Sequence, residues 1–355
     1  MVIGQLLNCM FDIITFGSAT QDIYLKSKKF LPRPDKKFHI GKSICLPAFS
    51  KMKVDDIAFS SGGGGTNTAA TFARQGLKVA YCGLVGDDCA GRLIIEELKE
   101  LKINTALVQT TNEKPTNMSI ILSYPDGEKT ILVYRGASDL LSKKDIPWLK
   151  IKKTKWFYLG PFAEDMANIT EDLIDFAKKN KIRMAFNPGY NQLTLPKPVL
   201  KRILAKVDIL ILNQEEASLL TKIPYQKPAR RSLGAGGGKE IFKKLDELVH
   251  GICIMTKGGE GAVASDGKYL YRAASLGRKA VDTTGAGDSF NSGFLSDFIK
   301  NSNIPSALQL GIANSAFNLG KLGAKEGLLR KGQKWPKVKI IKESCGQNNL
   351  CQIKI

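Results

Sequence analysis

Short hydrophobic runs alternate along the chain with segments in which apolar residues recur every three to four positions. The runs have the length of buried strands, and the periodic segments have the spacing of amphipathic helices. Strands followed in turn by helices indicate an α/β fold, a doubly wound and mostly parallel sheet flanked by helices. The predicted strands are 12–16, 79–82, 156–159, 184–186, 209–212 and 252–255, and the predicted helices are 90–101, 166–179, 199–205 and 215–220.

Two stretches depart from this alternation and are rich in predicted strands. Residues 22–60 contain short alternating segments, and residues 114–135 contain two alternating segments on either side of a Pro-Asp-Gly turn. A turn of this composition between alternating runs is typical of a hairpin. We therefore expect these stretches to form a small sheet apart from the main core.

Small residues precede a helical pattern at 281–290, which reads V-D-T-T-G-A-G-D-S-F. Gly285, Ala286 and Gly287 fall where the helix begins, and the backbone N–H groups of a first turn attract phosphate because they have no intrahelical partner. Asp288 stands in that first turn, where a carboxylate is placed to accept a proton. The alternative is an ordinary glycine-rich turn before a capped helix, but the length and chemical order of the run favour phosphoryl transfer.

A second glycine-rich motif, S-S-G-G-G-G-T-N, occupies 60–67. Gly63 and Gly64 let the backbone approach a small polyol, and Asn67 offers both a donor and an acceptor. Asp22 follows the first predicted strand and is able to accept hydrogen bonds from two hydroxyl groups. The alternatives are a flexible turn before a helix and an ordinary surface aspartate.

The pairing of G-G-x-x-x-N at 62–67 with D-T-x-G-A-G-D at 282–288 resembles the ribokinase-like (PfkB) carbohydrate kinases. The segment G-L-V-G-D-D-C-A-G at 83–91 is similar to a further stretch of that family. The resemblance runs over 12–329 and implies one kinase domain. Its lid over the sugar would come from the two strand-rich stretches, and the lids of two chains would pair in a homodimer.

The resemblance also implies roles for individual residues. Asp288 would be the general base for the acceptor hydroxyl, and the backbone at 285–287 would form the anion hole for the γ-phosphate of ATP. Glu216 would hold Mg²⁺ through water, and the backbone carbonyls of Asp282 and Thr284 would bind a monovalent cation such as K⁺. The nucleotide-binding residues that it implies are Asn187, Asn213, Thr256, Gly258, Gly261 and Asn314.

The acceptor is less well defined than the chemistry. Gly64 stands where ribokinases usually carry lysine, and Arg135 is placed either to reach an acidic or phosphorylated substrate or to form an ion pair in the lid. We expect phosphorylation of a hydroxymethyl group of a sugar or sugar-like molecule. The alternatives are a nucleoside kinase, in which Phe38, Phe49 and Phe162 would form a shelf for the base, and a non-catalytic binder of sugar or nucleic acid.

Composition changes this picture little. The formal net charge is +20 over 355 residues, but the basic residues are spread along the chain and accompany no recognisable nucleic-acid-binding motif, so no specific nucleic-acid partner is expected. No apolar stretch is long enough to span a membrane, and we expect a cytoplasmic protein. The segment 226–239 is predicted to be a mobile basic loop, and 333–355 a peripheral basic tail.

Overall fold

The computed structural model describes residues 10–38, 41–125, 128–225 and 238–345. Within them a ten-stranded sheet has the order β16-β15-β14-β13-β12-β11-β10-β1-β6-β7. Neighbouring strands from β7 to β13 run parallel, and the pairs β13–β14, β14–β15 and β15–β16 are antiparallel. The mostly parallel sheet is confirmed. Its strands are β1 (Phe11–Phe16), β6 (Val79–Gly86), β7 (Val108–Thr111), β10 (Thr154–Leu159), β11 (Arg183–Phe186), β12 (Ile209–Asn213), β13 (Ile252–Thr256), β14 (Ala262–Ser265), β15 (Tyr269–Ala273) and β16 (Ile340–Ser344).

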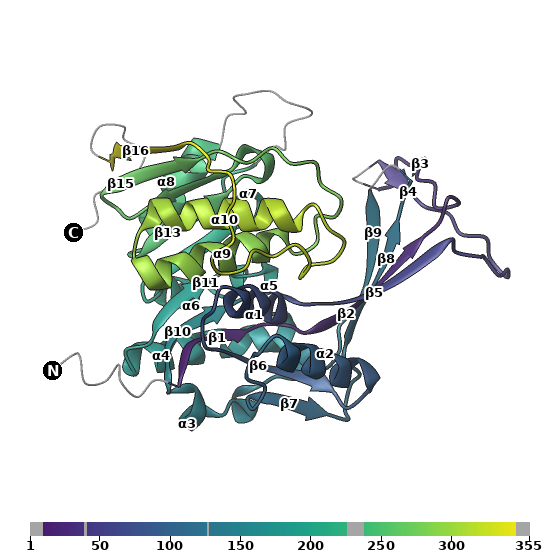
Figure 1. Ribbon diagram of the computed structural model, residues 1–355, viewed down its shortest axis with the longest axis horizontal. Coiled ribbons are helices and arrows are strands. Elements are labelled where there is room, and N and C mark those ends of the chain that lie inside the picture. The colour runs from purple at the N-terminus through teal and green to yellow at the C-terminus, as the bar shows by residue number, and fades with distance from the viewer. Residues whose placement is uncertain (1–9, 39–40, 126–127, 226–237, 346–355) are drawn as a thin grey trace.

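Helices cover both faces of this sheet (Figure 1). Ile13 and Ile14 of β1 are both buried, yet they belong to different hydrophobic clusters, because successive side chains of a strand point to opposite faces. One cluster contains residues of α1 (Gly64–Arg74), α2 (Cys89–Glu100), α9 (Ala286–Asn301) and α10 (Ile304–Asn318). The other contains residues of α3 (Trp148–Ile151), α4 (Thr170–Lys179), α5 (Tyr190–Leu193), α6 (Lys197–Leu204), α7 (Gln214–Thr221) and α8 (Gly238–Leu248).

The predicted elements lie within or close to the observed ones. Each predicted strand of the core falls inside a strand of the main sheet. The predicted helix 166–179 differs in its first part, because Glu164–Ile169 forms a 3₁₀ helix and α4 begins only at Thr170. Periodicity therefore located the elements, while local geometry set their ends.

A separate four-stranded sheet projects from one side of the body, and we call it the lid (Figure 1). Its order is β5-β2-β8-β9, with β2 and β8 parallel and the two outer pairs antiparallel. The small sheet expected from the two strand-rich stretches is thus confirmed. The lid strands are β2 (Thr20–Lys26), β5 (Asp56–Gly62), β8 (Asn117–Ser123) and β9 (Lys129–Tyr134), and β3 (Arg33–Pro34) pairs with β4 (Lys42–Ser43) in a further two-stranded sheet.

The lid joins the main sheet at the carboxyl ends of its parallel strands. β2 follows β1 after a short turn, β5 leads directly into α1, and β8 follows β7. In open α/β sheets ligands bind beyond this edge. The chain connectivity therefore places the lid over the edge where a ligand is expected.

Two predictions outside the core need comment. Within the predicted basic tail 333–355, Ile340–Ser344 forms β16, which pairs with β15 at the edge of the main sheet. Of the predicted loop 226–239, residues 226–237 lie outside the described residues, and Gly238 and Lys239 begin α8. Among the described helices, none combines the length and apolar character that a membrane crossing requires.

Candidate active site

The amino end of α9 is shaped by a glycine that no other residue replaces easily. Gly285 is the N-cap, with φ 74° in the left-handed region, and a Cβ there would lie 2.5 Å from Ala324 Cβ. Gly285 provides no capping side chain. Ala286 N donates to the Thr283 carbonyl oxygen at 3.3 Å, so the remaining N–H groups at the start of this helix of 16 residues are the ones left for an external anion.

Asp288 meets the second glycine-rich motif at this point. Asn67 Nδ2 donates to Asp288 Oδ2 at 2.9 Å. A Cβ at Gly64 would lie 3.5 Å from Asp288 Oδ1, and a Cβ at Gly287 would meet no other atom within 4 Å. The structure thus brings together the two motifs, and the backbone around the carboxylate leaves it accessible.

Burial shifts the pKa of both acidic residues of the site, and the charge of Asp288 acts on Glu216. Burial raises the pKa of Asp288, and the hydrogen bond from Asn67 opposes this shift. Burial likewise raises the pKa of Glu216 to about 7, and the charge of Asp288 adds to the increase, while hydrogen bonds from Asn213 and Asn187 oppose it. A carboxylate whose ionisation is disfavoured by burial and by a second carboxylate fits a divalent cation, which would offset the repulsion.

Asn213 and Glu216 also form the capping box of α7. Glu216 N donates to Asn213 Oδ1 at 2.8 Å, and Asn213 N donates to Glu216 Oε2 at 2.9 Å. One Glu216 oxygen is therefore held by the start of its own helix. This bond fixes the direction in which the carboxylate points.

Two residues linked to Asn187, namely Asn291 and Tyr158, were not among the site residues predicted from the sequence. Asn291 Nδ2 donates to Asn187 Oδ1 at 3.0 Å and contacts Tyr158 Oη at 3.2 Å. Asn187 Nδ2 in turn donates to the carbonyl oxygen of Ile211 in β12 at 2.9 Å. The available signal was the position of Asn291 three residues after Asp288, on the same side of α9.

The predicted nucleotide loop lies at the same edge of the sheet. Thr256, the last residue of β13, is the register partner of Asn213. Gly258 has φ 55° and open space at its Cβ position, whereas a Cβ at Gly261 would lie 2.0 Å from the Ala273 carbonyl oxygen. Gly258 leaves room for a ligand, and Gly261 is required by the packing of β15.

The prediction that Asn314 lines an adenine pocket is wrong. Its side chain is fully buried. Its Nδ2 donates to the Ser289 carbonyl oxygen at 2.7 Å and to Thr71 Oγ1 at 3.2 Å, and its Oδ1 accepts from Leu329 N at 2.8 Å. Asn314 therefore ties α10 to α1, to α9 and to the segment at Leu329, and its amide is fully engaged within the protein.

On the lid side, Asp22 lies against the glycine-rich motif. A Cβ at Gly62 would lie 2.3 Å from Asp22 Oδ2, and Gly63 has φ 95°. Asp22 is 4% exposed, and its burial raises its pKa, which a hydrogen bond with Ser119 partly offsets. Arg135, just beyond β9, is exposed and forms no ion pair among the described residues.

The side chains of Asp282 and Thr284, the two residues of the predicted monovalent-cation site, both contact the ammonium group of a lysine. Lys129 of the lid lies 2.5 Å from both Asp282 Oδ1 and Thr284 Oγ1. No pattern in the sequence indicated this contact. It places a positive charge directly before the anion-hole backbone, while the role of the two backbone carbonyls stays a prediction.

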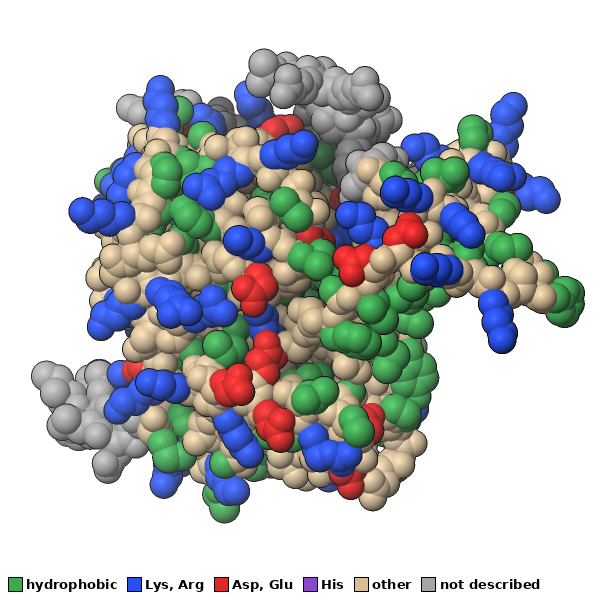
Figure 2. Space-filling model, turned by 45° about the vertical axis from the view of Figure 1, so that its right-hand side comes forward, with side chains coloured by type: hydrophobic (Ala, Val, Ile, Leu, Met, Phe, Trp, Pro, Cys, Tyr) green, Lys and Arg blue, Asp and Glu red, His purple; other side chains and the backbone are tan. Residues whose placement is uncertain are grey.

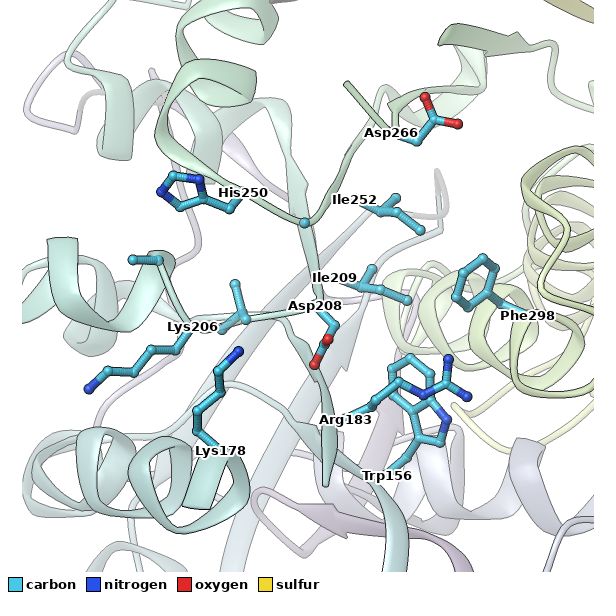
Figure 3. A pocket seen from close by; sticks show the side chains of 13 residues that line it. Trp156, Lys178, Arg183, Lys206, Asp208, Ile209, His250, Ile252, Asp266 and Phe298 are labelled. Carbon is cyan, nitrogen blue, oxygen red and sulfur yellow. The ribbon is translucent and has the colours of Figure 1, made fainter. Parts of the chain in front are cut away.

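A cavity of about 380 Å³ opens elsewhere, at the amino ends of β10 to β13 (Figure 3). Figure 3 shows Asp208 between Lys178 and Lys206 on one side and Arg183 and Trp156 on the other. Because Asn187, Asn213 and Thr256 stand at the carboxyl ends of the same strands, this cavity lies at the opposite edge. It takes no part in the site around Asp288.

Residues 10–331 match the sequence model of the pfkB family of carbohydrate kinases. The chain belongs to this family. As a PfkB-family carbohydrate kinase it is a phosphotransferase. The contact between Asn67 and Asp288 joins the two motifs on which the expectation of kinase chemistry was based.

Individual relatives agree with this assignment. The chain is 29% identical over 271 residues to an ATP-dependent 6-phosphofructokinase of Thermoanaerobacterium thermosaccharolyticum, covering 74% of this chain and 80% of the relative. It is 28% identical over 292 residues to a ribokinase of Lactococcus lactis, covering 81% and 88%. The structure of Arabidopsis thaliana ribokinase with ribose and ATP superposes with a TM-score of 0.71 at 21% identity, covering 90% and 96%, which shows a shared fold.

Proposed function

We propose that this PfkB-family kinase transfers the γ-phosphate of ATP to a hydroxymethyl group of a sugar or sugar-like acceptor, with Asp288 as general base. The observation that carries the proposal is the position of Asp288 in the first turn of α9. There a carboxylate held by Asn67 stands beside a helix end without a capping side chain. A base and an anion hole at one point are what phosphoryl transfer requires.

The residues support the following reaction. The acceptor oxygen attacks the γ-phosphorus and forms a bond to it. The bond between the γ-phosphorus and the β–γ bridging oxygen breaks, and ADP leaves with the electron pair. The hydroxyl proton passes to Asp288 Oδ1, because Oδ2 is already bonded to Asn67. N–H groups at 285–287 donate to the phosphate oxygens, and each such donor is typically worth about 3 kcal/mol in the transition state.

Glu216 and the loop after β13 suit the nucleotide side of this reaction. Glu216 would hold Mg²⁺ through a water molecule, with Asn187 and Asn213 orienting the carboxylate. Bound Mg²⁺ would neutralise part of the charge of the phosphates. Open space at Gly258 leaves the backbone after Thr256 accessible to the nucleotide.

The acceptor site is proposed to lie between Asp22, Gly63, Gly64 and Asn67, with Arg135 at its rim. Arg135 would suit an acidic or phosphorylated sugar, and one relative is a 6-phosphofructokinase. The nucleoside alternative is weaker, because the shelf that it needs does not form. Phe162 is buried in the main core, and Phe38 and Phe49 are exposed in the segment between β2 and β5.

We also propose a homodimer that forms through the lid. Phe59, Ile23, Ile120 and Leu132 form one row across the four strands, on the face opposite Asp22. Phe59 and Leu132 are exposed, at 63% and 52%. An exposed apolar sheet face marks an interaction surface. Sedimentation velocity of the wild type and of a Phe59→Asp variant tests this, since the variant should be monomeric.

The charge of the protein gives no support to a nucleic-acid function. Figure 2 shows Lys and Arg side chains distributed over the visible face, without one continuous basic patch. A cytoplasmic location and the absence of a specific nucleic-acid partner stay predictions.

The kinase proposal is tested by ADP release with a panel of sugars, sugar acids, sugar phosphates and nucleosides. Turnover with a sugar-type acceptor is expected, and Asp288→Asn should lower kcat by about 10²–10⁴-fold while the protein remains folded. Asp87→Asn is the matched control, because Asp87 is an exposed surface residue. Near wild-type kcat in Asp288→Asn would refute the assignment of the base, and turnover with nucleosides alone would favour the nucleoside kinase.

A further inference from the structure

Lys129 extends from the lid to the segment that leads into the anion hole. It is the first residue of β9, and its Nζ is bonded to the side chains of Asp282 and Thr284 at 2.5 Å each. Thr284 directly precedes Gly285. The contact therefore connects the lid side of the acceptor site with the phosphate side, across 153 positions of sequence.

A second lid strand reaches the same carboxylate. Tyr24 of β2 donates from its hydroxyl to Asp282 Oδ2 at 2.9 Å, and Gly323 N donates to the same oxygen at 3.0 Å. Thr284 donates to Asp282 Oδ1 from its backbone N at 3.0 Å and from its hydroxyl at 2.8 Å. The carboxylate thus holds the backbone that enters the anion hole, and it is itself held by the lid.

The ion pair is largely removed from solvent. The side chain of Asp282 is 3% exposed and that of Lys129 is 21% exposed. Burial acts to raise the pKa of Asp282, but its bonds to Lys129 and to neighbouring N–H groups hold that pKa well below its usual range. A buried lysine near the lid, Lys325, is instead paired with Glu97 of α2. Loss of Lys129 would leave the Asp282 carboxylate buried without its cation, which is costly.

The position of Lys129 in the lid makes this pair sensitive to the lid. β9 is the outermost strand of the lid sheet and is bonded to β8 alone among the described strands. The strand register puts Lys129 on the same face as Asp22 and Tyr24. Any displacement of the lid from the acceptor site would withdraw both Lys129 and Tyr24 from Asp282.

We propose that Lys129 is a positioning residue that couples closure of the lid to ordering of the anion hole. By binding Asp282 and Thr284, its ammonium group aligns the backbone of 285–287 only when the lid covers the acceptor. This inference rests on the proposed kinase function for its catalytic consequence. Its structural consequence is independent of that function.

The catalytic consequence is tested with Lys129→Ala, Lys129→Arg and the control Lys42→Met, at an exposed lysine of β4 in the two-stranded sheet. Lys129→Ala should lower kcat about 10- to 100-fold, because a small displacement of positioned groups costs this much, while the KM for ATP changes less than about threefold. Propylammonium should restore part of kcat in Lys129→Ala, and propanol should not, because the missing group is a charge. Lys129→Arg should retain more activity than Lys129→Ala, and Lys42→Met should match the wild type.

Unchanged kcat in a folded Lys129→Ala, or equal recovery with propanol and propylammonium, would overturn the inference. Hydrogen exchange of peptides that cover 281–290 gives a readout that needs no turnover. Exchange should be faster in Lys129→Ala than in the wild type and in Lys42→Met, and equal exchange in all three would also overturn it. A wild type that phosphorylates no acceptor would refute the proposed function, whereas the exchange result would still decide the role of Lys129.

Discussion

Asn67 Nδ2 donates a hydrogen bond of 2.9 Å to Asp288 Oδ2 and so joins two motifs that stand 221 residues apart. Asn67 lies on α1, directly after the lid strand β5, and Asp288 lies in the first turn of α9. Each helix thus begins at the carboxyl edge of the sheet, and the two meet where an acceptor and a phosphate must meet.

Replacing Asn67 should change the pH dependence of the reaction. In Asn67→Ala the bond that lowers the pKa of Asp288 is lost, while burial still raises it. A larger fraction of the base is then protonated at a given pH, so the acid limb of the kcat/KM profile should move to higher pH. Asn180→Ala, on α4's carboxyl end, is the control. An unmoved acid limb in Asn67→Ala would show that Asp288 is not the titrating base.

Gly285 and Gly287 should respond differently to the same substitution. Gly285→Ala meets both a left-handed φ of 74° and a Cβ contact of 2.5 Å with Ala324, so it should lower the melting temperature. Gly287→Ala has open space at Cβ and should keep wild-type stability, but the added methyl group narrows the phosphate site and should reduce kcat/KM for ATP. Thermal unfolding and steady-state kinetics of both variants check this, and similar stability losses in the two would contradict it.

Glu216→Gln should lower the activity of the enzyme and raise its stability at high pH. Burial raises the pKa of Glu216 from 4.5 to about 7, so its favourable contribution to folding is complete below its unfolded pKa and is lost as pH rises through about 7. The neutral amide avoids this loss. At pH 8 the variant should be more stable than the wild type by about 1–3 kcal/mol, with little difference at pH 4, and its kcat should fall. Denaturant unfolding at both pH values measures the effect, and a pH-independent difference would contradict it.

Asn314→Ala should behave as a core variant. It removes three hydrogen bonds between buried groups, so the free energy of unfolding should fall by about 2–4 kcal/mol. Where the variant is folded, its KM for ATP should equal that of the wild type. A raised KM together with unchanged stability would restore the adenine-pocket assignment that the structure rejects.

The parts of the fold that could be predicted are those with a strong local signal. The runs at 13–16 and 209–212 are buried on both faces, and such strands read as nearly continuous apolar segments. β16 lies on an edge and carries only exposed or partly exposed residues, among them Lys342 and Glu343, so its sequence resembles a polar tail. The pairing that makes it a strand comes from β15, which the sequence of β16 does not reveal.

The same distinction applies to the site. Asp288, Gly285 and Asn67 belong to motifs whose chemistry is visible in the chain. The contacts of Lys129 and Asn291 join residues far apart in the sequence and arise only on folding, and isolated lysines and asparagines are common on protein surfaces. Asn314 failed for the opposite reason, because a polar residue near the proposed nucleotide site is equally suited to joining helices in the core.

The antiparallel edge of β14, β15 and β16 lies on the side of the body away from the lid (Figure 1). A coupling tag fused beyond β16 would therefore attach the molecule to a support with its lid directed into free solution. Fluorophores on the lid and on the body would then report opening and closing from single immobilised molecules, without the support restricting the movement.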